Sequence, residues 1–448
     1  MKVTVLQENL AHGLNIVSRA VSTRSTLPVL GNVLVATDEG RLRLSATNLE
    51  LGITCWIGAK IEEEGSTTVP ARTFTELVGT LSPYAGLTDQ QVDLTLNIRT
   101  QTLNVHCGAS NTDLKCIDSQ EFPPMPSPDL ADGIQIGISE FKEMIQQVAF
   151  AASTDEARPI LTGVLMTVSP FPPQISAATQ GSAADARSRE AGYLTLAAAD
   201  GFRLSVRKAV LPGPPPRPVS AIIPARALTE LARITSTAAS GADTSARGES
   251  DSSKKERDQT ITMHLPPGRG QVIFRWKDVE LVSQLIEGNF PDFEQIIPRT
   301  YKTRTVVSTT AFLKACKQAE IFAREGSHIA RLNIYPPASR GTMQAEPVGG
   351  ARAAEGEASG AFHQDGPGSL VITGQSEETG SSQTEIPATV EGSPLLIAFN
   401  VRYLREVLEV IKTPEVALET SMETSPGLIR PVGEDNFVHV IMPMHLGS

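Results

Sequence analysis

One segment of the sequence occurs three times, and this internal repeat is the strongest constraint on the fold. Residues 69–77 read VPARTFTEL, residues 223–231 read IPARALTEL, and residues 399–407 read FNVRYLREV. The copies align on Arg72, Arg226 and Arg402, and the glutamates four positions later are Glu76, Glu230 and Glu406. Apolar residues two and five positions after each arginine predict one buried helix face. Such a repeat indicates three similar structural units.

The sequence around each copy repeats as well. Each unit opens with a β-like run, followed by polar residues that could cap a helix and then by an amphipathic helix. The predicted caps are Gln7 to Asn9, Ser139, and Ser308 to Thr310. Runs of alternating polarity predict strands after each helix, with a turn at residues 38–40 in the first unit. Each unit is therefore expected to be an α+β domain, with two helices packed on antiparallel sheets.

Unequal spacing between the copies is explained by low-complexity inserts. The predicted domains are residues 1–126, 127–299 and 300–448. Segments rich in Gly, Ala, Ser, Pro and charged residues interrupt the second and third domains; they cover approximately residues 170–192, 236–258 and 336–366. Such segments bury too little apolar surface to offset the entropy of ordering them. We expect them to be surface loops.

Composition excludes several classes of protein. The chain has 39 basic and 50 acidic residues, a net charge of −11. This balance argues against a broadly basic nucleic-acid coat, but it is compatible with a local basic surface. The four cysteines form no CxxC pair and lie beside no histidine cluster, which argues against a metal site or a disulfide framework. No signal peptide or membrane-spanning run is recognisable, so we predict a cytoplasmic protein.

No catalytic motif stands out in the sequence. His106 and Cys107 are neighbours on a predicted strand, so their side chains point to opposite faces. Residues 266–270, PPGRG, lack the lysine-serine ending of a phosphate-binding loop. We therefore predict a non-catalytic protein without a cofactor. Two alternatives stay open: a hydrolase that uses His106 or Cys107, and a repeated β-rich adhesion or scaffold module.

Positive charge recurs on the predicted helices although the chain as a whole is acidic. Equivalent elements carry basic residues in all three units, among them Arg19, Arg72, Lys142, Arg226, Arg233, Lys314, Lys317, Arg402, Arg405 and Lys412. If the helices lie side by side, they can form one basic surface. Such a surface would hold a polyanion through its phosphates, without reading bases and with salt-sensitive affinity.

Five blocks of sequence carry a resemblance to a known family. They read STLPVLGNVLV (25–35), TTVPARTFTEL (67–77), LAAADGFRLSV (196–206), LIEGNFPDFEQIIP (285–298) and VIMPMHL (440–446). Together they resemble the DNA polymerase III beta subunit, or beta sliding clamp, of bacteria. The resemblance implies three tandem clamp domains per chain and a head-to-tail homodimer that closes into a ring around double-stranded DNA. It also implies a processivity factor that tethers the replicative polymerase, the clamp loader and other proteins carrying clamp-binding peptides.

The resemblance also assigns residues. By position it places DNA contacts at Arg24, Arg72 and Arg158, and the internal repeat extends them to Arg226 and Arg402. It implies a dimer contact of Leu114 against Ile321 and Phe322. It further implies a partner-peptide pocket formed by Leu161, Gly201, Phe202, Arg203, Leu204, Pro291, Ile296, Asn400, Tyr403, Val440, Met442, Pro443 and Met444.

Overall fold

The computed structural model folds into two compact units, and each is described by itself. It describes residues 1–22, 27–81, 90–126, 133–170, 192–240, 259–266, 268–324, 328–337 and 368–445. Unit 1 comprises residues 1–145, 166–194 and 210–288, and unit 2 comprises residues 146–165, 195–209 and 289–448. Most of each predicted insert, as well as Arg24, lies outside the described residues.

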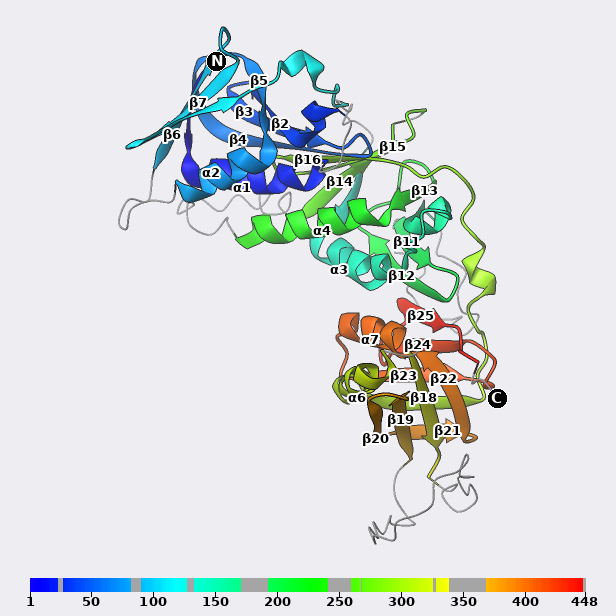
Figure 1. Ribbon diagram of the computed structural model, residues 1–448. Helices are drawn as coiled ribbons and strands as arrows, with labels where there is room; N and C mark the ends of the chain where they lie inside the picture. Colours follow the sequence, from blue (N-terminus) through cyan, green and yellow to red (C-terminus); the bar gives the residue numbers. More distant parts are fainter. Residues whose placement is uncertain are drawn as a thin grey trace, which may run out of the picture. The chain divides into compact units, whose positions relative to one another are not determined.

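The sheet of unit 1 is antiparallel and centres on the 13-residue strand β4 (Leu51–Glu63). Its strand order is β8 (Ser110–Lys115), β7 (Thr102–Cys107), β6 (Gln91–Asn97), β1 (Lys2–Leu6), β4, β16 (Val279–Gln284), β15 (Gln271–Trp276), β14 (Thr260–His264) and β9 (Ile134–Gly137). Strand β3 (Arg41–Thr47) also pairs with β4, and β2 (Asn32–Asp38) pairs with β3 and β5 (Ser66–Pro70). Because β4 pairs with both β1 and β16, it joins sequence-distant segments into one sheet (Figure 1).

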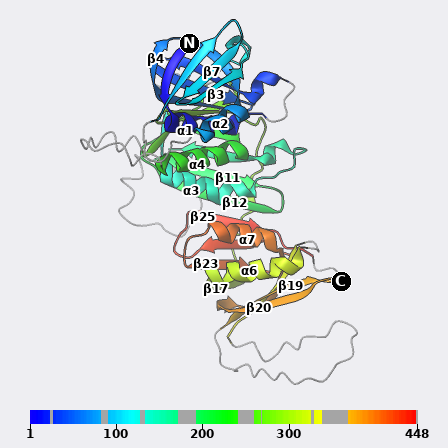
Figure 2. The same cartoon turned by 60° about the vertical axis from the view of Figure 1, so that its left-hand side comes forward.

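Two helices of unit 1, α1 (Gln7–Val17) and α2 (Ala71–Thr80), lie side by side (Figure 2). The Gln7 side chain joins them, since its Nε2 donates to the Val78 carbonyl at 2.8 Å. Gly13 lets α1 lie close to the sheet: a Cβ there would come within 2.8 Å of a Leu44 methyl group. Phe74 of the repeated segment is fully buried, as its spacing predicts.

Two further helices, α3 (Ile138–Val148) and α4 (Ala225–Ser240), lie next to each other in Figures 1 and 2. The strands between them in sequence are β10 (Gly163–Ser169), β11 (Gly192–Ala199), β12 (Arg203–Leu211) and β13 (Val219–Pro224). The second copy of the repeated segment thus spans the end of β13 and the start of α4, as β5 and α2 do for the first copy.

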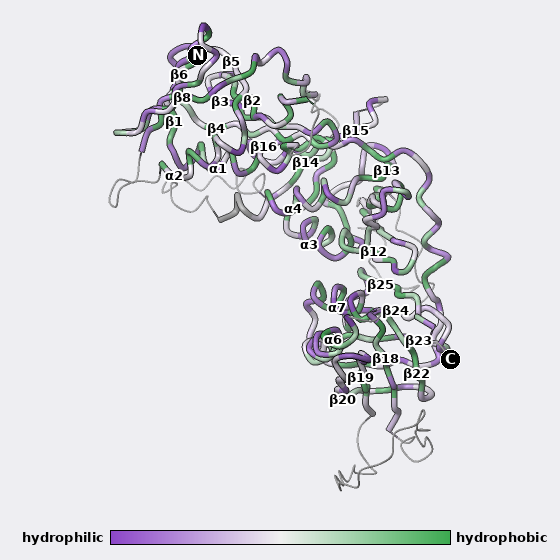
Figure 3. The backbone as a smooth tube through the Cα atoms, viewed as in Figure 1, coloured by the Kyte–Doolittle hydropathy of each residue, from purple (hydrophilic) through white to green (hydrophobic). Residues whose placement is uncertain are grey.

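Unit 2 contains two antiparallel strand arrays and the helices α6 (Thr309–Ala323) and α7 (Val401–Val410), which pack together. The first array runs β12, β25 (Phe437–Ile441), β24 (Gly427–Pro431), β23 (Glu415–Thr420), β17 (Thr303–Ser308) and β21 (Thr389–Gly392). The second array runs β20 (Gly380–Pro387), β19 (Ser369–Ser376), β18 (Ile329–Tyr335) and β22 (Leu395–Asn400). Figure 3 shows hydrophilic and hydrophobic residues interleaved along both helices. Their apolar residues, such as Phe312 and Leu404, form a core with Phe399 and Phe437.

Short 3₁₀ helices complete the described elements; they are Ser18–Ala20, Pro28–Gly31, Ser119–Glu121, Ala149–Ala151, Pro159–Thr162 and Phe293–Gln295. The expected α+β class is confirmed, with three helix pairs and antiparallel strands throughout the described residues. Two predicted caps are wrong: Gln7 to Asn9 form the first turn of α1, whose N-cap is Leu6, and Ser139 is the second residue of α3. The predicted cap at Ser308 is confirmed, since its side chain accepts from the Ala311 backbone N–H.

Candidate functional site

The three repeated arginines occupy the same position in their helices. Each is the second residue of its helix: Arg72 in α2, Arg226 in α4 and Arg402 in α7. All three are exposed, with 90% of the Arg72 side chain and 58% of the Arg402 side chain accessible. The preceding strand and the buried apolar face of the helix therefore hold each arginine at the surface.

The glutamate of the repeat pairs with the repeated arginine in two of the three helices. Arg72 Nε donates to Glu76 at 2.9 Å, and Arg402 Nε donates to Glu406 at 2.8 Å. In α4, by contrast, Glu230 bonds Arg19 at 3.1 Å and Arg233 at 2.8 Å. Within the described part of the chain, Arg226 makes no ion pair. Its charge is therefore the least compensated of the three.

Arg158, the remaining described DNA-contact candidate, is half exposed. Its Nε donates to Asp155 at 3.0 Å, and this bond, after the larger effect of the Ala157 backbone N–H, lowers the pKa of the Asp155 carboxyl. A Cβ at Gly201 would lie 3.2 Å from the Arg158 guanidinium. Arg158 is thus close to the turn that begins the candidate partner pocket.

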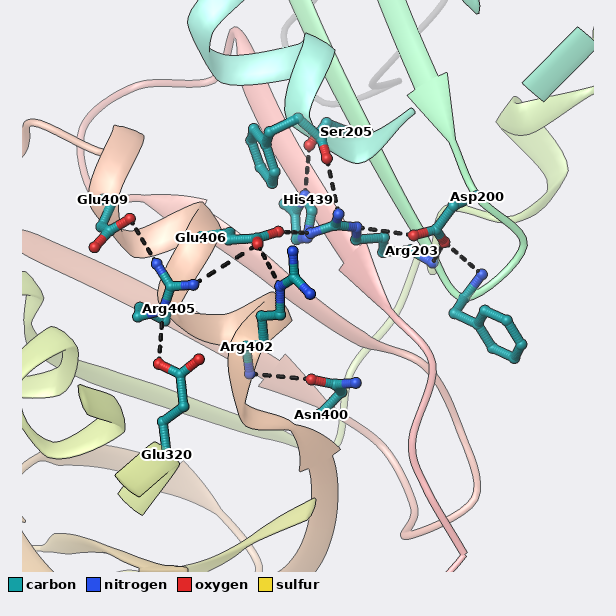
Figure 4. Close-up of polar contacts among 12 residues, drawn as sticks. Asp200, Arg203, Ser205, Glu320, Asn400, Arg402, Arg405, Glu406, Glu409 and His439 are labelled. Carbon is teal, nitrogen blue, oxygen red and sulfur yellow. Dashed lines mark hydrogen bonds and ion pairs between the residues drawn. The ribbon is translucent and has the colours of Figure 1, made fainter. Parts of the chain in front are cut away.

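A buried arginine organises the centre of that pocket in unit 2 (Figure 4). Only 8% of the Arg203 side chain is exposed, and it donates to Asp200, Glu406 and the carbonyl of Phe150. Its guanidinium also lies 4.3 Å from the centre of the Tyr403 ring. Burying a charge is costly unless it is paired and hydrogen-bonded, and here every side of the guanidinium has a partner. The network ties the turn before β12 to helix α7.

Glu406 is the acceptor shared by two arginines. Burial by itself would raise the pKa of its carboxyl, but hydrogen bonds from Arg203 and Arg402 outweigh burial and hold the pKa below the ordinary range. Arg405 on the same helix bonds Glu320 at 2.7 Å and Glu409 at 2.9 Å. The polar face of α7 is therefore a connected set of ion pairs (Figure 4).

His439 on β25 is a buried neighbour of this network. It is fully buried, its Nδ1 lies 2.5 Å from the Ser205 hydroxyl, and its ring stacks on Phe150 with centroids 5.5 Å apart. Burial, followed by the charge of Arg203, lowers the pKa of His439 well below its ordinary value. The imidazole is therefore neutral at physiological pH.

Some of the predicted pocket residues are apolar and exposed, and others are buried in the core below them. Phe202 is 59% exposed, Ile296 42% and Met442 39%. The backbone N–H of Met442 donates to the Phe202 carbonyl at 2.8 Å, so these two residues are brought together. Leu204 and Val440 are opposite each other on β12 and β25 and belong to a core that also contains Phe293 and Ile297.

Other predicted pocket residues have local structural roles. The Asn400 side chain caps α7 by accepting from the Arg402 backbone N–H at 3.0 Å. Gly201 has φ +96°, a conformation that favours glycine in the turn before Phe202. The Leu161 carbonyl accepts from Ser153, and the Met444 N–H donates to Ala398. Pro291 is exposed and Pro443 half-buried.

Sequence reasoning missed the partners of Arg203. Glu406 belongs to the repeated segment, and its recurrence in all three copies indicated that this glutamate has a structural role. Asp200 is three positions before Arg203, which is close enough for a local contact. Phe150 and His439 have no comparable signal, because they meet Arg203 through tertiary packing.

The predicted dimer residues lie in different units. Leu114 is on β8, at one end of the strand order of unit 1, and is only 7% exposed. Ile321 on α6 is 62% exposed, and Phe322 is half-buried. A shallow hollow of about 350 Å³ runs along α6, lined by Leu313, Lys317 and Ile321 among others.

The enzyme alternative finds little support in the environment of its two residues. Cys107 is 3% exposed and burial raises the pKa of its thiol, which disfavours the reactive thiolate. His106 is exposed and lies 3.6 Å from Asp93, so the two neighbours do point to opposite faces. No group of three or more potential metal ligands occurs in the described part of the chain. Among these residues, no helix is both long and apolar enough to span a membrane.

Comparison with solved structures identifies the class of fold. The crystal structure of a DNA polymerase sliding clamp from Bacillus subtilis matches with a TM-score of 0.77, at 26% identity and over 100% of both chains. The DNA polymerase III beta subunit from Thermotoga maritima matches with a TM-score of 0.75 at 23% identity, a likeness that concerns the fold. The architecture is thus that of a polymerase sliding clamp.

Sequence comparison gives the family. The beta sliding clamp of Synechococcus elongatus is 30% identical over 100% of both chains, and that of Bacillus subtilis is 29% identical over 99% of both. Family models of the DNA polymerase III beta subunit match residues 1–126 (N-terminal domain), 186–292 (central domain) and 363–445 (C-terminal domain). The chain belongs to the DNA polymerase III beta subunit family. The predictions of a DNA sliding clamp and of a non-catalytic processivity subunit are confirmed at this level.

Proposed function

We propose that two copies of this chain form a head-to-tail ring around double-stranded DNA, in the cytoplasm. The observation that carries the proposal is the set of exposed arginines at the same helix position, Arg72, Arg226 and Arg402. Arg24 and Arg158 complete the proposed DNA contacts. Arginines in this arrangement bind phosphates and carry no base readout, so the ring can move along any sequence.

The proposed mechanism is topological. A closed ring cannot leave circular DNA, so a protein bound to it is held at high effective concentration near the DNA. Weak phosphate contacts suit this task, because tight contacts would oppose sliding. The acidic net charge of −11 keeps non-specific attraction to DNA low everywhere except at the local arginines.

The proposed dimer joins the β8 end of one copy to the α6 end of another. Strand β8 ends the strand order of unit 1, and β20 ends that of the second array of unit 2, so each offers an edge for pairing. Exposed Ile321 and half-buried Phe322 supply apolar surface beside β20 on α6, opposite the region of Leu114. Such an unlike contact closes into a ring when the rotation per subunit is half a turn.

The proposed partner site is the pocket of unit 2, with Phe202, Ile296 and Met442 as the exposed apolar contacts. A short peptide with apolar anchors fits this surface, and the polymerase, the clamp loader and other proteins would present such peptides. Methionine adapts its shape to different ligands, which suits a site used by several partners. The buried Arg203 network would hold the pocket in shape before binding, so little ordering cost falls on the complex.

Retention on DNA tests the ring. After loading, the protein should stay on nicked circular DNA and leave the same DNA once it is linearised. Ile321→Asp should run as a monomer in gel filtration and lose retention, whereas Arg331→Ala, an exposed change on β18, should keep both. Equal escape from circular and linear DNA would contradict the proposal.

Peptide binding tests the pocket. Deleting residues 442–448 should abolish binding of a fluorescent clamp-binding peptide and leave the dimer intact. Phe202→Ala should weaken binding by about tenfold, in line with loss of a buried aromatic contact. Unchanged affinity in both variants would refute the site.

A further inference from the structure

A second hollow, polar in character, lies within unit 2, away from the residues assigned above. It has a volume of about 270 Å³ and is lined by Arg299, Tyr301, Arg304, Glu419 and Arg430, together with the β24–β25 turn. Three arginines against the carboxylates of Glu419 and Asp435 leave an excess of positive charge. The strand register explains the cluster: Arg304 on β17 is directly opposite Glu419 on β23, and Arg430 on β24 is opposite Ala417.

Two of these arginines have unused hydrogen-bond donors. The Nε atoms of Arg304 and Arg430 lie 3.8 Å and 3.4 Å from the Glu419 carboxylate. These are ion pairs without hydrogen-bond geometry, and among the described residues neither guanidinium makes a hydrogen bond. The side chains of Arg304 and Arg430 are 30% and 28% exposed, so each is partly enclosed by its neighbours. A guanidinium presents five donors in a rigid fork that matches the oxygens of a phosphate.

The volume of the hollow allows a ligand larger than a single ion. A volume of 270 Å³ holds several waters at roughly 30 Å³ each, which is room for a small organic molecule. Tyr301 lines the hollow and is 47% exposed, so its aromatic ring is accessible to a ligand there. An aromatic face stacks on nucleobases of any identity, since every base has a π-face.

We propose that this hollow binds a mononucleotide, with Arg304 and Arg430 donating to its phosphate and Tyr301 stacking on its base. Glu419 forms ion pairs with both arginines when the hollow is empty and repels the phosphate when it is filled. Arg299 adds charge at the rim. The site is separate from the proposed DNA contacts and partner pocket, so it does not depend on the proposed function.

Calorimetric titration of the full chain tests this site with inorganic phosphate, deoxyadenosine and deoxyadenosine 5′-monophosphate. The monophosphate should bind more tightly than phosphate, and deoxyadenosine should show no binding. Arg430→Ala should weaken the monophosphate by about tenfold or more, the loss expected for a charged hydrogen bond. Glu419→Gln should instead strengthen it, because it removes the repelling charge.

Two controls keep the test decisive. Arg331→Ala removes an exposed arginine of the same unit from another sheet and should leave the affinity unchanged. Arg304→Lys keeps the charge but loses the fork, so it should weaken binding even if Arg430→Ala fails to fold. No heat with the monophosphate, equal affinity in wild type and Arg304→Lys, or weaker binding by Glu419→Gln would overturn the proposal.

Discussion

At the scale of single residues, Glu406 on α7 connects a buried arginine to an exposed one. Glu406 accepts from both Arg203 and Arg402, so the same carboxylate serves a buried network and a surface arginine. The repeat predicts a glutamate at this position, but its partner Arg203 lies 203 positions earlier in the chain. The spacing of four residues predicts the bond between Arg402 and Glu406, whereas the bond between Arg203 and Glu406 forms only through tertiary packing.

Glu406→Gln should destabilise the protein by about 1–3 kcal/mol, because it removes a charged acceptor from a nearly buried arginine. The folded pKa of Glu406 lies below its unfolded value, so its contribution is present above about pH 4.5 and is lost as pH falls through the folded pKa. Urea unfolding at pH 7 measures the loss. Glu409→Gln, at a more exposed ion pair, should cost less; an equal or larger cost would contradict the assignment.

His439 should make the protein less stable in mild acid. Its imidazole stays neutral when folded, whereas the unfolded chain takes up a proton below about pH 6.5. Stability should therefore fall by about 1.4 kcal/mol per pH unit below 6.5 from this residue, until the folded pKa is reached. Thermal unfolding between pH 7.5 and 5.5 checks the trend.

The control for this prediction is His439→Gln, which keeps a polar partner for Ser205 and should show a shallower dependence on pH. His12 also has a pKa lowered by burial, so some dependence should persist. An identical slope in wild type and variant would show that His439 does not titrate as argued.

At the scale of elements, periodicity predicted the helices better than their ends. The apolar spacing of the repeated segment placed Phe74, Leu228 and Leu404 in the core, and all three are fully buried. The polar residues 7–9 predict a helix start one to three residues after the observed N-cap, Leu6. Gln7 does not cap the helix, because its side chain bonds the Val78 carbonyl. A cap competes with tertiary contacts for the same side chain, and the sequence does not say which contact forms.

Asn400 should stabilise α7 through its cap. Asn400→Ala removes the acceptor for the Arg402 N–H and should lower stability by about 1 kcal/mol, while Asn400→Asp should retain most of it. Thermal melting of the two variants compares them directly. If Asn400→Asp melts as low as Asn400→Ala, the cap is not the reason for any loss.

At the scale of the whole molecule, the proposed DNA contacts belong to a chain of net charge −11. Arg72 and Arg402 share their charge with glutamates on their own helices, whereas Arg226 does not. The three arginines are therefore equivalent by position but unequal by electrostatics.

Arg226→Ala should weaken binding to a short duplex more than Arg72→Ala does. Loss of one phosphate contact should also reduce the slope of log affinity against log salt by about 0.9. Fluorescence anisotropy over a range of salt concentrations measures both quantities, with Arg331→Ala as the neutral control. A larger effect from Arg72→Ala would contradict the ranking.

The threefold repeat, the helix and strand periodicities, the exposed arginines and the family can all be recognised in the amino-acid sequence. These follow from spacing along the chain, which is preserved however the chain is folded. Pairs three or four residues apart, such as Arg72–Glu76, follow from helix spacing. The ion pairs that join distant residues depend on the tertiary structure, because only folding brings those side chains together. Arg19 reaches Glu230 across 211 positions, and among the described residues Arg226 has no ion-pair partner. Arg203 meets Asp200 within its own turn, but Glu406 and Phe150 reach it from distant parts of the chain, and no local pattern specifies those two contacts.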